Sequence, residues 1–256
     1  MNASRAEAAF WAAFLRNRNV GAETAANGAI PVAGGFALYG AGTFLDIAIG
    51  IGTTRPLRPD DLTVLSEFYG RRGLPARVQL DRAVFERDRP LLEAAGYAED
   101  RAPLAVLEAP TAGSEPAADG EIAVRTVTDR RAWTELNLRG EDRIAEADRE
   151  RLRRTMQAVA AAAHGLFVAS VDGADAGTGA LGISGDVAVL FGGVVLPAYR
   201  RRGVHRALIA ARTAFAHGRG AARAALKTRP GSFSERSALG LGFVPAGELH
   251  RLLRAP

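Results

Sequence analysis

The chain has 256 residues, of which 48% are hydrophobic and 24% charged, and it contains no cysteine. This length and balance are typical of a globular protein with one large domain or two smaller ones. The missing cysteines exclude a disulfide framework, a zinc–thiolate site and a covalent cysteine intermediate, and they fit a reducing compartment. No apolar run approaches the ~20 residues that cross a bilayer. We therefore expect a cytoplasmic location and no membrane partner.

The first half of the chain predicts alternating strands and helices. An amphipathic helix should open it, with Ser4 as N-cap and Glu7 completing a capping box. The helix over 58–73 should be capped by Asp60. The expected elements after the first helix are a hairpin-like strand pair at 27–40, a strand at 44–52, the helix at 58–73, a strand at 75–80, a helix at 89–97 ended by Gly96, and a strand at 102–108.

The second half repeats this order after a linker from Ala109 to Glu121, which is rich in proline, glycine and acids. Both halves close with strand, helix, Gly-Tyr or Gly-Phe, and strand, which indicates a decayed internal duplication. The fold class is α/β (α+β), with domains at 1–112 and 121–256. The expected elements are a strand at 121–127, helices at 128–137 and 148–165, strands at 166–173, 174–184 and 186–197, a long helix from about 202, a strand at 222–229, a helix at 232–242 and a strand at 243–254.

Positive charge is concentrated in one segment of the second half. Residues 193–236 hold ten basic residues and one acidic residue, whereas the rest of the chain holds 23 basic and 27 acidic residues. Within that segment a strand runs through Val194 and Val195 into Pro197, and three adjacent arginines, Arg200, Arg201 and Arg202, precede Gly203. The first N–H groups of the helix that follows have no partner within it, and the helix dipole adds positive potential. This pattern predicts an anion site at a helix N-terminus, where Gly203 lets a phosphate approach the backbone closely.

Arg200-Arg201-Arg202-Gly203-Val204-His205 resembles the R/Q-x-x-G-x-G/A pyrophosphate loop of the GNAT superfamily of acetyl-CoA-dependent N-acetyltransferases. The preceding GGVVLPAY is similar to that family's fourth strand, and residues 232–243 resemble its second CoA-contacting segment. The match spans about 166–254, and the first half resembles the degenerate partner domain of tandem members.

The resemblance implies two tandem GNAT-like mixed-sheet domains, of which only the second binds acetyl-CoA. The backbone of Val194 and Val195 would pair with the pantetheine arm. The pyrophosphate would be bound by the loop and the first helical turn, and basic side chains near Arg229 or Arg236 would reach the 3′-phosphate. The implied acetyl-CoA contacts are thus Val194, Val195, Arg200, Arg201, Arg202, Gly203, Val204, His205, Arg206 and Ser237.

Three positions depart from the family pattern. His205 stands where glycine or alanine is usual, and its imidazole could itself donate to a phosphate. Ser237 stands where asparagine is usual, and no tyrosine lies between Ser237 and Phe243 to protonate the departing thiolate. The first half carries two prolines in GIGTTRPLRPDD at the equivalent of the loop, and prolines remove backbone donors.

The general base has two candidates, Glu141 and Asp142, in the connection between the first two helices of the second half. By resemblance that connection lines the acceptor cleft; the alternatives are a solvated acidic loop and a proton relay through water. The four histidines are scattered, which excludes a metal site of the usual spacing. We expect direct acetyl transfer to a primary amine of a small molecule, with no metal and no nucleic acid as partner. A homodimer, a non-catalytic acyl-CoA-binding module and a nucleic-acid-binding face remain open alternatives.

Overall fold

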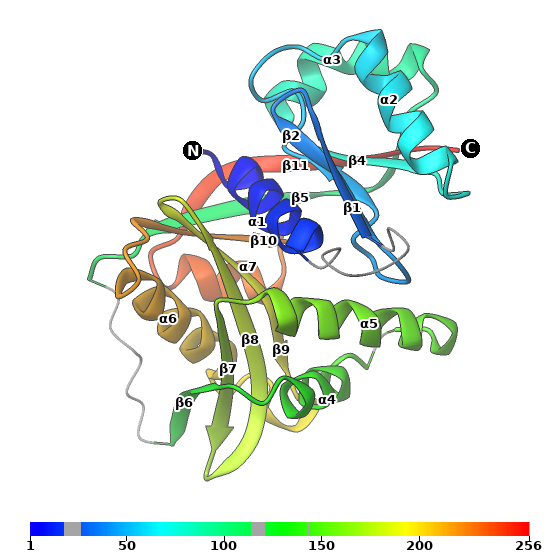
Figure 1. The fold of residues 1–256 in the computed structure, drawn as a ribbon. Coiled ribbons are helices and arrows are strands. Elements are labelled where there is room, and N and C mark those ends of the chain that lie inside the picture. Colours follow the sequence, from blue (N-terminus) through cyan, green and yellow to red (C-terminus); the bar gives the residue numbers. More distant parts are fainter. Residues whose placement is uncertain (18–26, 114–120, 143, 256) are drawn as a thin grey trace. The chain divides into compact units, whose positions relative to one another are not determined.

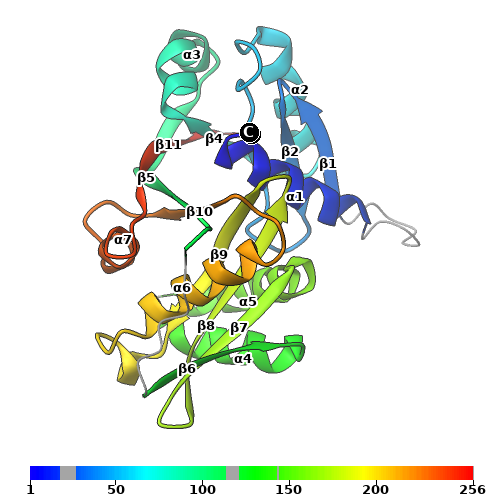
Figure 2. The same ribbon diagram turned by 90° about the vertical axis from the view of Figure 1, so that its left-hand side faces the viewer.

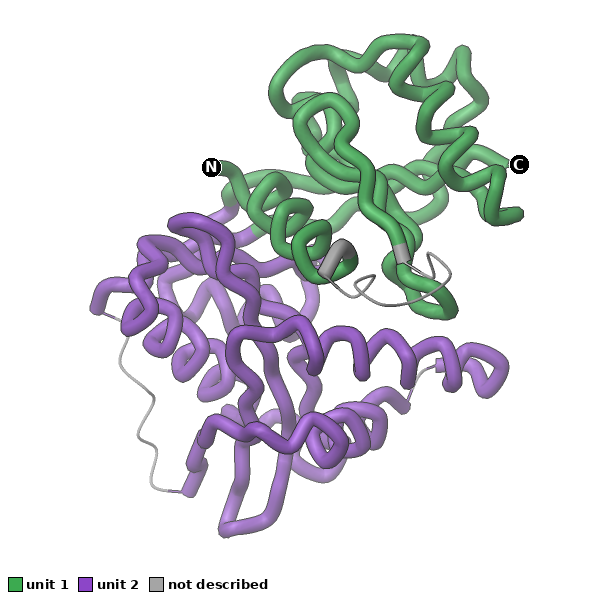
Figure 3. Tube along the Cα trace, in the orientation of Figure 1, with its two compact units in different colours: residues 1–106, 246–256 green, residues 107–245 purple. Residues whose placement is uncertain are grey.

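The computed structural model describes residues 1–17, 27–113, 121–142 and 144–255 and divides them into two compact units (Figure 3). Unit 1 consists of Met1–Val106 together with Ala246–Pro256, and unit 2 of Leu107–Pro245. Two strands, β5 (Ala98–Pro110) and β11 (Val244–Arg254), therefore contribute residues to both units. The division at residues 112 and 121 stays a prediction, and residues 114–120 of the expected linker lie outside the described part of the chain.

Unit 1 is a mixed sheet with helices packed on it (Figure 1). The strands β1 and β2 form a hairpin whose turn residues, Ala33 and Gly34, both have positive φ, as a two-residue type I′ turn requires. β3 pairs antiparallel with β2 and parallel with β4, and β11 pairs antiparallel with β4. Besides β5 and β11, the elements of unit 1 are α1 (Ala3–Asn17), β1 (Asn27–Val32), β2 (Gly35–Gly40), β3 (Ile47–Ile49), α2 (Pro59–Gly70), β4 (Ala76–Asp81) and α3 (Arg82–Ala94).

Unit 2 repeats the sequence of strand hairpins followed by strand, helix and parallel strand (Figure 2). The strands β6 to β9 pair antiparallel in chain order, and β9 pairs parallel with β10 through the crossover helix α6. Besides β5 and β11, the elements of unit 2 are β6 (Ile122–Val127), α4 (Arg130–Gly140), α5 (Glu146–Ala162), β7 (Gly165–Val171), β8 (Ala174–Ser184), β9 (Val187–Val195), η1 (Pro197–Tyr199), α6 (Val204–His217), β10 (Arg223–Thr228) and α7 (Phe233–Leu239).

The helices of unit 2 lie on both faces of its sheet. A side chain at Gly192 would point toward Trp133 of α4, whereas a side chain at the next residue, Gly193, would point toward Arg212 and His205 of α6. Successive residues of a strand point to opposite faces, so α4 and α6 cover opposite sides of β8 and β9 (Figure 1). A hydrophobic core that includes Leu181, Leu190, Leu208 and Phe243 joins α6 and α7 to the sheet.

Three details of the predicted helices are wrong. α1 is capped by Asn2, whose side-chain oxygen accepts a hydrogen bond from the N–H of Arg5, because the hydroxyl of the expected cap, Ser4, donates to Asp81 instead. α2 is capped through Asp61 rather than Asp60. α3 begins at Arg82 instead of Arg89, because the residues before Pro90 bury Val84 and Phe85 against the sheet.

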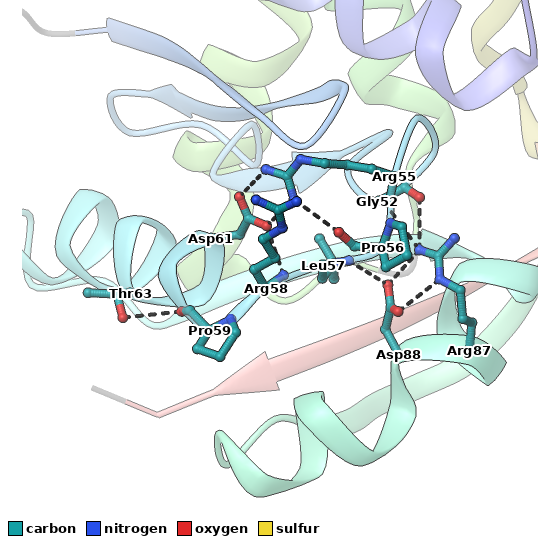
Figure 4. Close-up of polar contacts among 10 residues, drawn as sticks. All are labelled: Gly52, Arg55, Pro56, Leu57, Arg58, Pro59, Asp61, Thr63, Arg87 and Asp88. Carbon is teal, nitrogen blue, oxygen red and sulfur yellow. Dashed lines mark hydrogen bonds and ion pairs between the residues drawn. The ribbon is translucent and has the colours of Figure 1, made fainter.

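The loop before α2 is closed by two carboxylates of unit 1 (Figure 4). Asp61 accepts hydrogen bonds from the backbone N–H of Arg58 at 2.9 Å and from the guanidinium of Arg55 at 2.6 and 2.7 Å. Asp88 of α3 accepts from the N–H of Leu57 at 3.0 Å. The protein's own acids thus bind the backbone N–H groups of the two residues that precede α2.

We expect Asp61→Asn to lower the free energy of unfolding by about 1 kcal/mol at neutral pH, the usual cost of a weakened helix cap. The hydrogen bond from Arg55 holds the pKa of Asp61 below its ordinary value of 3.8. A lowered pKa means that this stabilisation is present above about pH 4 and is lost as the pH falls through the pKa of the folded state. Urea unfolding at pH 7 and near pH 2.5 tests both statements, since the difference between the two proteins should be smaller at the lower pH. Glu67→Gln, which breaks an exposed pair with Arg71, is the control and should change little.

Candidate functional site

A bulge interrupts the antiparallel pairing of β8 and β9 in unit 2. Thr178 pairs with Val194 and Ala180 pairs with Phe191, so that Gly192 and Gly193 together oppose Gly179. Gly192 has φ +60°, the left-handed backbone of a glycine bulge. The bulge turns β9 away from the regular ladder at these two glycines.

The pairing of β9 with β10 ends beside this bulge. Paired residues run from Val187 with Arg223 to Leu190 with Leu226, although β9 continues to Val195. Backbone groups of β9 beyond Leu190 on the β10 side therefore have no partner strand in the described register. The predicted residues Val194 and Val195 lie in this stretch, where an extended ligand could add its own hydrogen bonds to the strand.

Side chains of α4 fix the bulge from one face of the sheet. Trp133 is 1% exposed, and its ring lies 3.0 Å from where a Cβ on Gly192 would be. The side-chain amide of Asn137 donates to the carbonyl oxygen of Gly192 at 3.0 Å and to the hydroxyl of Thr178 at 2.8 Å. The geometry of the bulge is thus specified by buried groups.

The loop that follows β9 and η1 leaves the N-terminus of α6 without a side-chain cap. Arg201 has φ +64° and Gly203, the N-cap, has φ +85°. No side chain caps this helix, in contrast to α2. The first N–H groups of α6, which belong to Val204, His205 and Arg206, lie at the positive end of the helix dipole.

The three adjacent arginines of this loop differ in their partners. Arg200 forms a two-armed ion pair with Asp142 at 2.9 and 3.0 Å and also donates to the carbonyl oxygens of Gly140 and Val195. Arg202 lies 3.3 Å from Asp172 and 3.6 Å from Glu121. For Arg201 the described residues provide no hydrogen bond or ion pair. Carboxylates of the protein therefore offset much of the repulsion among the three arginines. Of the three, Arg201 is the one whose charge is not already neutralised by a protein group.

His205 points into the protein from the first turn of α6. Its Nε2 lies 3.5 Å from where a Cβ on Gly193 would be, and its ring meets that of Phe233 edge to face. Burial, with a smaller contribution from Arg212, lowers the pKa of His205 to about 4, so the imidazole is neutral at pH 7. His205 thus lines the bulge of β9, and the exposed Arg206 follows it on the helix.

The segment around α7 contributes polar groups to the other side of the opening. Ser232 caps the helix, Ser237 is half-buried within it, and the guanidinium of Arg236 donates to the carbonyl oxygen of Gly231 at 2.7 Å. Arg229, which follows β10, is exposed and lies close enough to Glu141 to affect its pKa.

The two predicted acids, Glu141 and Asp142, have different surroundings. α4 reaches β9 at Gly140, where any Cβ would overlap Val194 at 2.2 Å, and Glu141 follows directly. Burial, and then the charge of Asp142, raise the pKa of Glu141, whereas Arg200 and Arg229 act in the opposite direction. Asp142 is committed to Arg200 and ties the α4–α5 connection to the loop before α6. Glu141 is therefore the better placed of the two to exchange a proton.

Four of the ten basic residues in 193–236 are either paired with carboxylates or buried. Arg200, Arg202 and Arg223 are paired with carboxylates, and Arg212 is buried.

The described residues hold no cluster of three or more metal-ligating side chains. Within the described part of the chain, no helix is long and apolar enough to cross a membrane.

Sequence reasoning missed the residues that fix the bulge. Asn137 and Thr178 gave no signal because buried polar pairs look like ordinary surface residues in a sequence. The glycine pair at 192–193 inside an apolar strand was the available sign, since glycine in a strand interior marks a bulge or a close backbone approach. A second available sign was Arg212, a single charged residue on an otherwise apolar helix face.

Comparison with known proteins places these features in context. The model of the acetyltransferase (GNAT) family matches residues 130–243. No curated protein matches the chain. Among solved structures, a GCN5-related N-acetyltransferase from Kribbella flavida superposes with a TM-score of 0.71 and 16% identity over 100% of this chain and 97% of that one. A tandem GNAT protein from the clavulanic acid biosynthesis pathway superposes with a TM-score of 0.58 and 15% identity over 85% of this chain and 77% of that one.

Proposed function

Residues 130–243 form an acetyltransferase domain of the GNAT family, and from that premise we propose that the protein transfers an acetyl group from acetyl-CoA to a primary amine of a small molecule. One observation carries the proposal: the uncapped N-terminus of α6 follows a strand whose edge beyond Leu190 has no partner strand in the described register. We retain a cytoplasmic location as part of the proposal.

The proposed binding mode assigns each part of the loop a task. The N–H groups of Val204, His205 and Arg206 and the side chain of Arg201 would bind the pyrophosphate, which suits a helix N-terminus with no side-chain cap. The unpaired edge of β9 at Val194 and Val195 would pair with the pantetheine arm. Arg200 and Arg202 would act mainly by holding the loop, because their guanidinium groups already bind carboxylates. Ser237 and the basic residues Arg229 and Arg236 would complete the contacts from the side of α7.

The proposed transfer needs a base, a polarising donor and a proton source. Acetyl-CoA would supply the activated thioester. Glu141 would accept the proton that the amine loses as its nitrogen forms the new amide bond, and backbone N–H groups of the β9 bulge would stabilise the negative charge on the carbonyl oxygen. When the carbon–sulfur bond breaks, the thiolate would take its proton from solvent, since Tyr199 is the one tyrosine of unit 2 and lies in η1.

Titration with acetyl-CoA is the first test of this proposal. We expect one site per chain, because in the corresponding loop of unit 1 the N–H groups of Leu57 and Arg58 already bind Asp88 and Asp61 (Figure 4), and Pro59 at the start of α2 has no N–H to offer. At 100 times its dissociation constant the ligand should raise the free energy of unfolding by about 2.7 kcal/mol. Calorimetry gives the stoichiometry and thermal melting the stabilisation. Two sites, or none, would contradict the proposal.

A second candidate function is a non-catalytic acyl-CoA-binding module. Ser237 in place of the usual asparagine and the missing tyrosine favour it. Acetyl-CoA turnover with a panel of amino sugars, polyamines and other primary amines separates the two functions. Binding of acetyl-CoA without transfer to any amine would support the module.

A further inference from the structure

Arg212 is a buried arginine on the face of the β9 bulge that α6 covers. Only 2% of Arg212 is exposed to solvent. Nε donates to the carbonyl oxygen of Leu208 on its own helix at 2.9 Å, and Nη1 donates to those of Ala180 and Phe191 at 3.2 and 3.1 Å. Ala180 and Phe191 are the last pair of the β8–β9 ladder before the bulge. Arg212 therefore joins the two strands at the point where their regular pairing stops.

The glycines of the bulge make room for this guanidinium. A Cβ on Gly179 would lie 2.9 Å from Nε of Arg212, and a Cβ on Gly193 would lie 3.5 Å from Nη2. Nη2 donates to no group among the described residues. The free end of the guanidinium is thus directed at the backbone of Gly193, next to the unpaired edge of β9.

The charge of Arg212 has no counter-ion in the described part of the chain. No carboxylate lies within ion-pair distance, and burial alone lowers the pKa of Arg212, to about 10, so the group stays charged at neutral pH. A buried charge without an anionic partner is costly. Three carbonyl oxygens could be satisfied by neutral donors, so hydrogen bonding alone does not account for a cation at this position.

We propose that Arg212 is a positioning residue for acetyl transfer: it fixes the carbonyls that flank the β9 bulge and holds a positive charge behind the backbone at which negative charge develops. The inference rests on the proposed function and adds a residue to it. The ground state offers no anion to this guanidinium, whereas the transferring carbonyl oxygen becomes negative beside Gly193. Arg212 should therefore stabilise the transition state more than bound acetyl-CoA.

The test compares Arg212→Gln, which keeps a hydrogen-bond donor but no charge, with Arg212→Lys, which keeps a charge. We expect Arg212→Gln to lower kcat by about tenfold or more, with a dissociation constant for acetyl-CoA within about threefold of that of the wild type. Arg212→Lys should retain more activity at low pH. A buried lysine has a lowered pKa, so the ratio of its kcat to that of the wild type should fall as the pH rises from 6 to 9. His205, the ionisable side chain that interacts with Arg212, is neutral throughout this range and does not contribute to the change.

Thr213→Val provides the matched control, because Thr213 is also 2% exposed on α6 but its hydroxyl donates only to Ile209 of its own helix. It should leave kcat unchanged. Equal kcat for all folded variants, or a kcat ratio for Arg212→Lys that does not depend on pH, would show that Arg212 is only structural and overturn the inference. If neither Arg212→Gln nor Arg212→Lys folded, Arg212 would again be only structural and the inference would be overturned. A wild-type protein that transfers no acetyl group would reject the proposed function itself, and the inference with it.

Discussion

Replacing Glu141 with glutamine should lower kcat for acetyl transfer by about 10² to 10⁴-fold, the range for loss of a general base. Glu141 follows the point where α4 contacts β9, and burial raises its pKa. A carboxylate with a raised pKa is a stronger base than an exposed one. The glutamine has nearly the same shape, so binding of acetyl-CoA should change little. Steady-state kinetics with a saturating amine, together with calorimetry, measure the two quantities.

The pH dependence gives an independent check on this role. Glu141 can accept a proton only as the carboxylate, so activity should rise with pH through its pKa. Asp142→Asn removes a negative charge that raises this pKa and releases Arg200, whose charge lowers it. Both effects have the same sign, and the acidic limb of the profile should therefore move to lower pH.

Glu146→Gln is the control for both experiments, since Glu146 lies in the first turn of α5 and pairs with Arg149 at the surface. It should retain the wild-type kcat and pH profile. If Glu141→Gln kept more than half of kcat, Glu141 would be a solvated surface acid and a water relay would be the better mechanism.

The second large effect is expected at Gly203, where alanine should weaken acetyl-CoA binding about tenfold or more. Gly203 has φ +85°, which an L residue adopts only at a cost of about 1–2 kcal/mol. A Cβ at this position, the N-cap of α6, would lie 3.4 Å from the side chain of Ile122 in β6. The strained backbone and the new methyl group would both disturb the array of N–H groups that we assign to the pyrophosphate.

Gly220, beyond the other end of α6, provides a control for the strain. It has φ +80°, and a Cβ there would meet nothing within 4 Å. Gly220→Ala should therefore lower stability about as much as Gly203→Ala and leave acetyl-CoA affinity unchanged. Thermal melting and calorimetry of both variants decide the matter. Equal affinity in the two would place the phosphates elsewhere.

The order of the elements could be predicted from the sequence because local signals agree with the fold. Asp172 and Gly173 formed a turn signal between two apolar runs, and both adopt the positive φ of a type I′ hairpin. Helix starts were less predictable. Asn2, Ser4, Asp60 and Asp61 are all competent caps, and the choice among them depends on distant partners such as Asp81 and Arg55.

The candidate site shows the same division between local and distant information. The loop before α6 could be located from Pro197 and Gly203, which act through their own backbones. The partners of Arg200 and Arg202 could not, because Asp142 and Asp172 lie far away in the sequence and only the folded sheet brings them close. The buried position of Arg212 likewise depends on two strands and a helix meeting at the bulge.

Because residues 246–256 belong to unit 1, that unit cannot form completely until these residues have been synthesised. During synthesis the strands β1 to β4 leave the ribosome long before β11, their neighbour beside β4, is available. Until then the edge of β4 is an open template for incorrect pairing, and unit 1 should reach its full stability only once β11 has paired with β4. A gene cut within the linker would yield an N-terminal fragment that lacks one of its own strands. Co-expressing the two fragments, rather than purifying either alone, is therefore the sensible way to divide this protein.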